Sequence, residues 1–319
     1  MKALLKNGKS VTVAKSAKPV AADTQVVIQV GLAGLCRTDI YAAQGKLKVR
    51  DPLILGHELA GTVDSVGATV EGVKSGQRVT VNPILRCDHC NRCKQGESCC
   101  DTGFVGLDLD GGFAEYIAVP AYTVLPLADD VSFLHAAYTE PVAASLAVLK
   151  SGITPAEQGA IFGKNRFSEL MQLILDLYGF GKLPVYDLDS AEEMRELKGL
   201  SGSFDYVIET FASSAVLKAM VAAIKPGGKM ILKSRQYEPV AFKLIDVLKK
   251  EPVMHVVNYG SFDDALDLLS SGKLNVDGLV DDIYALESFE HVFERASSSE
   301  SLKPFFYPGM LQADFCAAC

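Results

Sequence analysis

The chain has 319 residues, 49% of them hydrophobic and 22% charged, and its 31 Lys and Arg against 39 Asp and Glu give a formal net charge of −8. This composition excludes a disordered or fibrous chain, and the length indicates about two domains. An acidic chain without a basic tract is poorly suited to phosphate backbones, so we expect no nucleic-acid partner. The sequence has neither an apolar run of the roughly 20 residues that span a bilayer nor an N-terminal signal-peptide core, so we expect no membrane contact and a cytoplasmic location.

Two patterns of secondary structure divide the chain. Short β-prone runs punctuated by Gly and Pro continue to about residue 122, which is typical of an irregular β domain. From about residue 151, β-prone runs alternate with amphipathic helices. The strands expected there are 159–162, 184–187, 204–209 and 229–232. This alternation predicts a parallel sheet of dinucleotide-binding type, and therefore an α/β chain.

Five of the eight cysteines lie within fourteen residues. Cys87, Cys90 and Cys93 are separated by gaps of two residues, which let thiolate sulfurs converge on one ion, and four such ligands suit tetrahedral zinc. The alternative is a disulfide cluster, but bonds at this spacing would be strained and a cytosolic setting disfavours them. We therefore expect a closed, structural zinc site, with Cys100 favoured over Cys99 as its fourth ligand.

A second group of metal-binding residue types lies outside that cluster. Cys36 follows a strand-like run, and His57 and Glu58 open another. Cys, His and Glu are good zinc ligands, and a site with three protein ligands and a water is the open, catalytic kind. Spacing alone leaves open the alternative that His57 is a packed or surface residue.

The motifs around these residues occur in a fixed order along the chain. They are Gly-Leu-Cys-Arg-Thr-Asp at 34–39, Gly-His-Glu-Leu-Ala-Gly at 56–61, the three-cysteine segment, Asp-Gly-Gly-Phe-Ala-Glu-Tyr at 110–116 and Glu-Pro-Val-Ala-Ala at 140–144. In order and spacing they resemble the zinc-dependent medium-chain alcohol and polyol dehydrogenases. The resemblance covers about 1–155 strongly and continues more loosely beyond.

The resemblance implies a fold and a domain organisation. A GroES-like irregular β domain would comprise residues 1–150 and 277–319, with the structural zinc lobe at 87–100. A shortened, Rossmann-like nucleotide-binding domain with a parallel sheet would comprise 151–276. Relatives form dimers or tetramers through the edge of the Rossmann sheet, so the resemblance also implies a homodimer or homotetramer.

A set of catalytic zinc ligands follows from the same resemblance. Cys36, His57 and Glu140 resemble the ligands of the polyol-type enzymes, and Glu58 resembles the neighbouring carboxylate that binds the metal when substrate or water leaves. Zinc held in this way acts as a Lewis acid on the substrate alcohol, which then gives hydride to a nicotinamide cofactor.

Further residues near these ligands match roles known in the family. Thr38 matches the hydroxyl that relays the proton, and Asp39 matches the acid that orients the metal ligands. Tyr41 stands where many relatives place a relaying His, so the outer relay is expected to differ. Arg37 is a candidate for cofactor phosphate, with a solvated surface position as the alternative.

The nucleotide-binding half departs from the family pattern. The turn G-x-G-x-x-G is here Gly-Lys-Asn-Arg-Phe-Ser and keeps only its first glycine, Gly163. Asn165 and Ser168 replace the glycines that let the backbone approach the pyrophosphate and the helix pack on the strand. Lys164 and Arg166 are candidates for phosphate contacts at the start of the helix.

The segment after this turn is also unusual. Asp187 lies 24 residues after Gly163, near where an acid holds the ribose hydroxyls and favours NAD over NADP, with a surface turn as the alternative. The interval 187–204 holds one helix, expected at 191–198, and has no room for a further strand and helix. We therefore expect a truncated sheet whose second strand becomes an edge.

Two functions of different class follow from these observations. The first is a zinc-dependent oxidoreductase that transfers hydride between a secondary alcohol of a polyol, sugar or aminocyclitol and NAD or NADP, with NAD favoured. The alternative is a zinc protein on the same scaffold that has lost free NAD(P) use and acts as a non-redox lyase or isomerase, or as a binding pseudoenzyme. Residues 163–168 are the feature that discriminates between the two.

Overall fold

The computed structural model describes residues 1–319 except 88, 95–98, 100, 188–198, 299–301 and 310–319. The chain forms two compact units, one of Met1–Glu140 with Val276–Cys319 and one of Pro141–Asn275. It passes from the first unit to the second within helix α4 (Thr139–Leu146). No helix in the described parts of the chain is long and apolar enough to cross a membrane.

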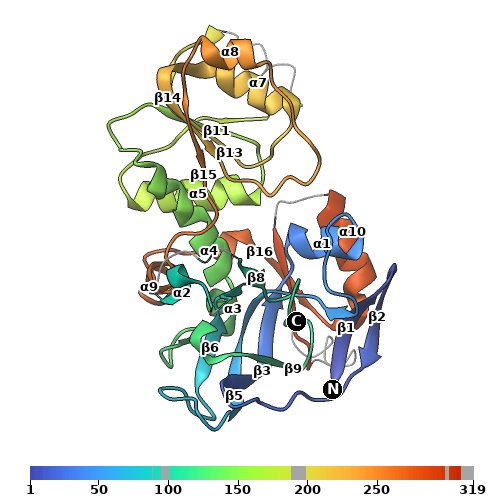
Figure 1. The fold of residues 1–319 in the computed structure, drawn as a ribbon. Helices are drawn as coiled ribbons and strands as arrows, with labels where there is room; N and C mark the ends of the chain where they lie inside the picture. The colour runs from blue at the N-terminus through green and yellow to red at the C-terminus, as the bar shows by residue number, and fades with distance from the viewer. Residues whose placement is uncertain (88, 95–98, 100, 188–198, 299–301, 310–319) are drawn as a thin grey trace. The chain divides into compact units, whose positions relative to one another are not determined.

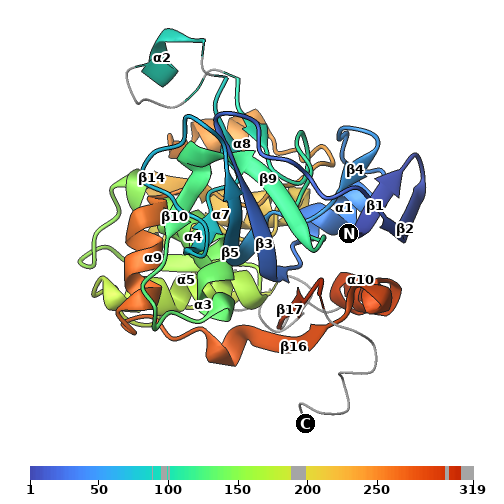
Figure 2. The same cartoon turned by 90° about the horizontal axis from the view of Figure 1, so that it is seen from below.

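The first unit is built around an irregular, mainly antiparallel sheet (Figure 2). Its strands are β3 (Gln25–Gly34), β5 (Glu58–Val66), β6 (Arg78–Val81), β9 (Tyr116–Pro120), β10 (Val124–Pro126), β16 (Val280–Tyr284) and β17 (Lys303–Phe306). Among the described residues the order is β10-β6-β5-β3-β17-β16, and β9 pairs with β3. Because β17 pairs antiparallel with the end of β3, the C-terminal part of the chain returns to the first sheet.

Smaller elements complete the first unit. The strands β1 (Lys2–Asn7), β2 (Ser10–Lys15) and β4 (Leu53–Ile54) form a sheet in the order β2-β1-β4, and β7 (Ile84–Leu85) pairs with β8 (Gly103–Phe104). The helices are α1 (Arg37–Ala43), α2 (Asn91–Lys94), α3 (Phe133–Ala137) and α10 (Phe289–Ser298), and 3₁₀ turns occupy Ala121–Thr123, Asp277–Leu279 and Leu286–Ser288. Figure 2 shows α10 beside β16 and β17.

An apolar core joins the early and late segments of the first unit. Leu4, Val30 and Leu59 are buried in it, and the rings of Phe113 and Phe306 meet edge to face with 5.0 Å between centroids. Each fully buried side chain of this kind contributes about 1.5–3 kcal/mol relative to an exposed one. The core therefore fixes β17 against the strands that position the candidate site.

The second unit is a parallel sheet with helices on both faces (Figure 1). Its strands are β11 (Gly159–Phe162), β12 (Val185–Tyr186), β13 (Phe204–Glu209), β14 (Ile224–Leu232) and β15 (Val253–Val256). Its helices are α5 (Arg166–Leu177), α7 (Ser214–Ala223), α8 (Leu244–Leu248) and α9 (Phe262–Ser270), with a 3₁₀ turn at Ala147–Ser151. In the described residues the strand order is β12-β11-β13-β14-β15.

Alternating side chains of β13 separate the two faces of this sheet. Val207 packs with the apolar stripe of α7, whereas Tyr206 and Ile208 pack with Met171 and Leu175 of α5. This is the period-two alternation expected of a strand that is buried on both faces.

The expected fold class, a GroES-like β domain with a Rossmann-type parallel sheet, is confirmed. In the described part of the chain β12 lies at one edge of the sheet, as the short interval after it predicts. The expected helix at 191–198 lies outside the described residues. The start expected for the fourth strand, residue 229, was wrong: β14 begins at Ile224, because its first residue pairs with Phe204 before the register shifts.

Candidate metal centre and nucleotide turn

Cys36 and His57 are brought together by the ends of two paired strands. β3 ends at Gly34 and is followed by Cys36, the N-cap of α1. His57 immediately precedes β5, which pairs antiparallel with β3 so that Gly34 lies opposite Glu58. As a result, one ligand atom from each of Cys36, His57 and Glu58 lies within 4.8 Å of the others.

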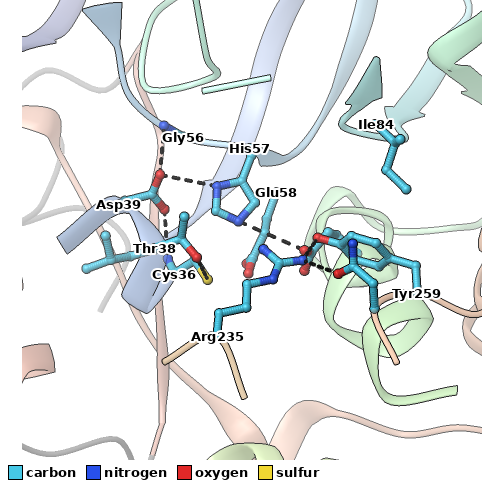
Figure 3. Close-up of polar contacts among 12 residues, drawn as sticks. Cys36, Thr38, Asp39, Gly56, His57, Glu58, Ile84, Arg235 and Tyr259 are labelled. Atoms are coloured by element: carbon cyan, nitrogen blue, oxygen red, sulfur yellow. Dashed lines mark hydrogen bonds and ion pairs between the residues drawn. The ribbon is translucent and has the colours of Figure 1, made fainter. Parts of the chain in front are cut away.

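Asp39 holds this arrangement in place (Figure 3). Its side chain is fully buried, and its Oδ2 accepts a hydrogen bond from the backbone N–H of Cys36 at 3.0 Å. Its Oδ1 lies 3.1 Å from the backbone nitrogen of Gly56 and 3.2 Å from Nδ1 of His57. One carboxylate therefore closes the first turn of α1 and also orients the imidazole.

The other ring nitrogen of His57 is available to a ligand. Nε2 is buried and has no hydrogen-bond partner among the residues that the structure describes. Burial disfavours the protonated ring, but the charges of Asp39 and Cys36 outweigh burial and raise the pKa of His57 well above its usual value. A buried imidazole nitrogen without a partner, beside a thiol and a carboxyl, fits a zinc ion in both position and donor type.

Glu58 forms a buried ion pair with Lys303 of β17. The two side chains are 2% and 1% exposed, and the Lys303 ammonium also donates to the carbonyl of Leu35 at 3.2 Å. Burial raises the pKa of Glu58 above its usual value, and the charge of Lys303 opposes that rise. A Cβ at Gly34 would lie 2.6 Å from the Glu58 carboxylate, so only glycine leaves room for this side chain.

The other residues expected at the catalytic site lie on α1 and α4. Glu140 is buried in the first turn of α4, with its Oε1 4.0 Å from Nε2 of His57. Thr38 is buried with its hydroxyl 3.6 Å from Sγ of Cys36. Tyr41 is partly buried, with the Lys46 ammonium 5.5 Å from its ring centroid.

Four cysteines form a second group of ligand atoms. The sulfurs of Cys87, Cys90, Cys93 and Cys99 all lie within 4.8 Å of one another. The backbone N–H of Cys87 points at the Cys99 sulfur, and that hydrogen bond is the main cause of the lowered pKa of Cys99. A lowered pKa favours the thiolate form that binds metal. Cys100, the expected fourth ligand, lies outside the described residues.

The residues expected to bind the cofactor phosphate are distributed around the start of α5. Gly163 follows β11 with φ at +109°, and a Cβ there would lie 2.6 Å from the Thr210 hydroxyl. Lys164 is exposed, and Arg166 is the first residue of α5 and partly buried. Asn165, however, caps the helix itself, with its side chain accepting from two backbone N–H groups.

Two further candidates for cofactor contacts lie on other elements. Asp187 directly follows β12 in the second unit and is partly buried. Arg37 is the first residue of α1 in the first unit and is also partly buried.

Comparison with known proteins agrees with the sequence motifs. The model for the alcohol dehydrogenase GroES-like domain matches residues 22–129. Sorbitol dehydrogenase of Bacillus subtilis is 28% identical, with 96% of each chain covered, and D-xylulose reductase A of Aspergillus niger is 24% identical over 87% of this chain and 88% of that protein. Residues 22–129 therefore match the alcohol dehydrogenase GroES-like domain, and the chain as a whole resembles the zinc-dependent medium-chain dehydrogenases.

Several solved structures share the fold of this chain. A short chain alcohol dehydrogenase from Escherichia coli CFT073 in complex with NADH has a TM-score of 0.86 at 21% identity, covering 96% of this chain and 99% of that one. The 2R,3R-butanediol dehydrogenase of Bacillus subtilis has a TM-score of 0.83 at 23% identity, covering 97% and 99%.

Two features of the site were missed by the sequence prediction. Lys303 stands in the apolar run Leu-Lys-Pro-Phe-Phe, and a lone lysine in a buried strand indicates a buried acidic partner. The sequence around Lys303 does not indicate that this partner is Glu58. Asn165 and Ser168 have the i, i+3 spacing of a helix capping box, which is a recognisable local signal.

Proposed function

We propose that this chain is a zinc-dependent oxidoreductase that transfers hydride between a secondary alcohol and a nicotinamide cofactor. The observation that supports it most is the cluster of Cys36, His57 and Glu58. In it the buried Nε2 of His57 lies beside a partly buried thiol and has no hydrogen-bond partner in the described part of the chain. The substrate class we propose is a polyol, sugar or aminocyclitol. The segment around Glu140 resembles the corresponding segment of the polyol enzymes, and two similar proteins are named sorbitol dehydrogenase and D-xylulose reductase A.

Cys36, His57 and Glu140 would hold the catalytic zinc, with Glu58 as an adjacent carboxylate. Zinc in such a site supplies Lewis acidity toward an alcohol oxygen and lowers the pKa of the alcohol. We assign the four-cysteine group a second, structural zinc, with Cys99 as its fourth ligand in place of Cys100.

The chain's own polar residues then handle the proton and the geometry. The Thr38 hydroxyl, buried beside Sγ of Cys36, would accept the alcohol proton and pass it outward. Asp39 would keep Nδ1 of His57 protonated, so that Nε2 remains the free ligand atom. Tyr41, on the same helix as Thr38, would take the outer place in this relay.

The cofactor we propose is NAD rather than NADP. Asp187 lies at the end of the second strand of the sheet, where a carboxylate accepts from ribose hydroxyls and repels a 2′-phosphate. Lys164, Arg166 and Arg37 are the basic residues proposed for the cofactor phosphates. Native-chain titrations with NADH and NADPH test this preference, and tighter binding of NADPH would contradict it.

We also propose that the chain forms a homodimer or a homotetramer in the cytoplasm. β15 lies at one end of the described sheet order, and its Val253 and Val256 are 51% and 82% exposed. An exposed apolar edge strand is a template for pairing with a second copy. Light scattering on the purified chain should give twice or four times the monomer mass, and a monomer at micromolar concentration would contradict the proposal.

The activity is tested on the zinc-loaded protein with a panel of alcohols, namely sorbitol, xylitol, an inositol and 2,3-butanediol, while reduced nicotinamide is followed. We expect turnover of at least one polyol with NAD, and loss of at least 100-fold in kcat/KM in H57A. The exposed His291 supplies the matched control, because H291A should retain native activity. Equal activity of H57A and the native protein would overturn the proposal.

A second candidate is a zinc lyase or isomerase that does not use free NAD(P). One observation favours it, namely that side chains of the second unit already bind the backbone N–H groups at the start of α5. Dehydration or epimerisation of a polyol without added cofactor would support this candidate. Saturable micromolar NADH binding by the native chain would contradict it.

A further inference from the structure

The start of α5 is closed by side chains of its own unit. Oδ1 of Asn165 accepts from the backbone N–H groups of Phe167 at 2.9 Å and Ser168 at 3.1 Å. The Ser168 hydroxyl accepts from the backbone N–H of Asn165 at 3.0 Å and donates to its carbonyl at 2.7 Å. The N–H groups of Phe167 and Ser168 belong to the first turn of α5, where no carbonyl four residues earlier in the helix accepts from them, and such groups bind anions. The N–H of Ser168 also lies 3.0 Å from the carbonyl oxygen of Asn165.

The cap is also anchored to the neighbouring strand. Nδ2 of Asn165 donates to the Thr210 hydroxyl at 3.1 Å, and that hydroxyl donates to the carbonyl of Gly163 at 2.9 Å. Thr210 directly follows β13, and β13 pairs in parallel with β11. The bond network therefore spans the carboxyl ends of two adjacent parallel strands, the place where open α/β sheets bind their ligands.

A second set of hydrogen bonds connects the carboxyl ends of the next two strands, β13 and β14. Glu209, the last residue of β13, is buried, and its Oε1 accepts from the backbone N–H groups of Lys233 at 2.7 Å and Ser234 at 2.8 Å. The Ser234 hydroxyl in turn accepts from the backbone N–H of Ala212 at 3.1 Å. The Glu209 carboxyl and the Ser234 hydroxyl thus accept hydrogen bonds from backbone N–H groups that follow β14 and β13, respectively.

A dinucleotide pyrophosphate does not fit the α5 turn while Asn165 holds this position. The phosphate oxygens need the same N–H groups of Phe167 and Ser168, and the Asn165 side chain occupies the approach that a glycine leaves open. Charge-assisted bonds to phosphate are stronger than neutral ones, so a pyrophosphate can compete with the amide, but it does so against an anchored cap.

We propose that Asn165 is an intramolecular competitor of the cofactor pyrophosphate, and that it sets the affinity of this chain for dinucleotides. The cap must leave the helix start and release Thr210 before the pyrophosphate binds. The proposal rests on the proposed use of a nicotinamide cofactor, but it concerns binding rather than turnover.

Calorimetric titration of the zinc-loaded full chain with NADH tests the proposal directly. We expect N165G, which removes both the cap and its bulk, to bind NADH at least tenfold more tightly than the native chain. N165A keeps a Cβ but lacks the cap, and should also bind more tightly. N165D keeps both acceptor bonds and adds a negative charge, so it should bind more weakly than the native chain.

A matched control separates cap competition from a general loss of stability. Ser261 caps α9 by accepting from the backbone N–H of Asp264 at 3.0 Å, so S261G removes a helix cap elsewhere in the same unit. S261G should bind NADH as the native chain does. Thermal melting of both glycine variants establishes that each is folded.

The possible results distinguish failure of the cap proposal from failure of the cofactor proposal. If the native chain binds NADH and folded N165G binds no more tightly, the cap proposal is overturned and the oxidoreductase proposal stands. If neither binds at millimolar NADH, both are overturned. If N165G binds and the native chain does not, the cap proposal is supported and the native chain is better described as the non-redox protein.

Discussion

The Oδ1 of Asp39 lies 3.2 Å from Nδ1 of His57, while its Oδ2 accepts from the backbone N–H of Cys36. Replacement by Asn puts an amide N–H₂ against one of these donors and removes the charge that favours a protonated Nδ1. We expect D39N to lower the affinity for the catalytic zinc by about 10–100-fold. A competition titration with a chromophoric chelator measures this change.

The control for D39N is a variant of Asp64, whose carboxylate forms an exposed ion pair. Asp64 accepts a hydrogen bond from the Lys18 ammonium at 2.7 Å, so D64N removes a charge and leaves the residues of the candidate metal centre unchanged. D64N should keep native zinc affinity. A D39N protein that holds two zinc ions as tightly as the native one would show that Asp39 does not orient His57.

Breaking the buried ion pair between Glu58 and Lys303 should destabilise the first unit strongly. K303M leaves the Glu58 carboxyl buried without its cation, and breaking a buried pair in this way costs about 3–5 kcal/mol. We therefore expect a large fall in the unfolding midpoint of K303M. The double variant E58Q/K303M removes both charges and should recover most of the stability that K303M loses. Equal unfolding midpoints for K303M and the double variant would contradict the ion pair.

The fourth cysteine of the structural site is tested by metal content. Because the Cys99 sulfur lies with those of Cys87, Cys90 and Cys93, we expect C99S to bind one zinc per chain where the native protein binds two. C100S is the matched control and should keep two. Native mass spectrometry measures the number of zinc ions per chain in both variants. One zinc in C100S and two in C99S would make Cys100 the fourth ligand.

Asp205 gives a pH-dependent contribution to the stability of the second unit. Its hydrogen bond from the Lys225 ammonium at 2.7 Å, together with one from the backbone N–H of Gln158, holds its pKa below the usual value. A lowered carboxyl pKa in the folded chain stabilises at neutral pH, and this contribution is lost as the pH falls below the unfolded value of about 3.9.

We therefore expect D205N to be less stable than the native chain at pH 7, by about 0.2–1 kcal/mol because the pair is partly exposed. The difference should narrow as the pH is lowered from 5 to 3. Thermal melting of both proteins across this range measures it. A difference that is constant with pH would show that the charge of Asp205 contributes nothing.

The sequence motifs indicated the residues of the candidate metal centre better than the residues that contact them. Cys36 and His57 could be proposed as ligands because their motifs resemble those of the family, whereas spacing alone left His57 open as a packed or surface residue. The pairing of β3 with β5 brings the two residues together. Lys303 could not be assigned to Glu58, because that contact depends on β17 returning to pair with β3. A long-range pairing of this kind has no local signature.

The nucleotide turn shows the same limit. The loss of two glycines predicted a steric obstacle, and the spacing of Asn165 and Ser168 is that of a helix cap. The anchoring of Asn165 by Thr210 depends on β11 and β13 being adjacent, which the sequence pattern of either strand alone does not specify.

The proposed activity depends on one zinc ion that Cys36 and His57 bind together. An anomalous difference map recorded at the zinc edge, from crystals of the zinc-loaded protein, tests it most directly. We predict a peak about 2.3 Å from Sγ of Cys36 and about 2.0–2.1 Å from Nε2 of His57, besides a peak within the four-cysteine group. A map with zinc only at the four cysteines would contradict the account.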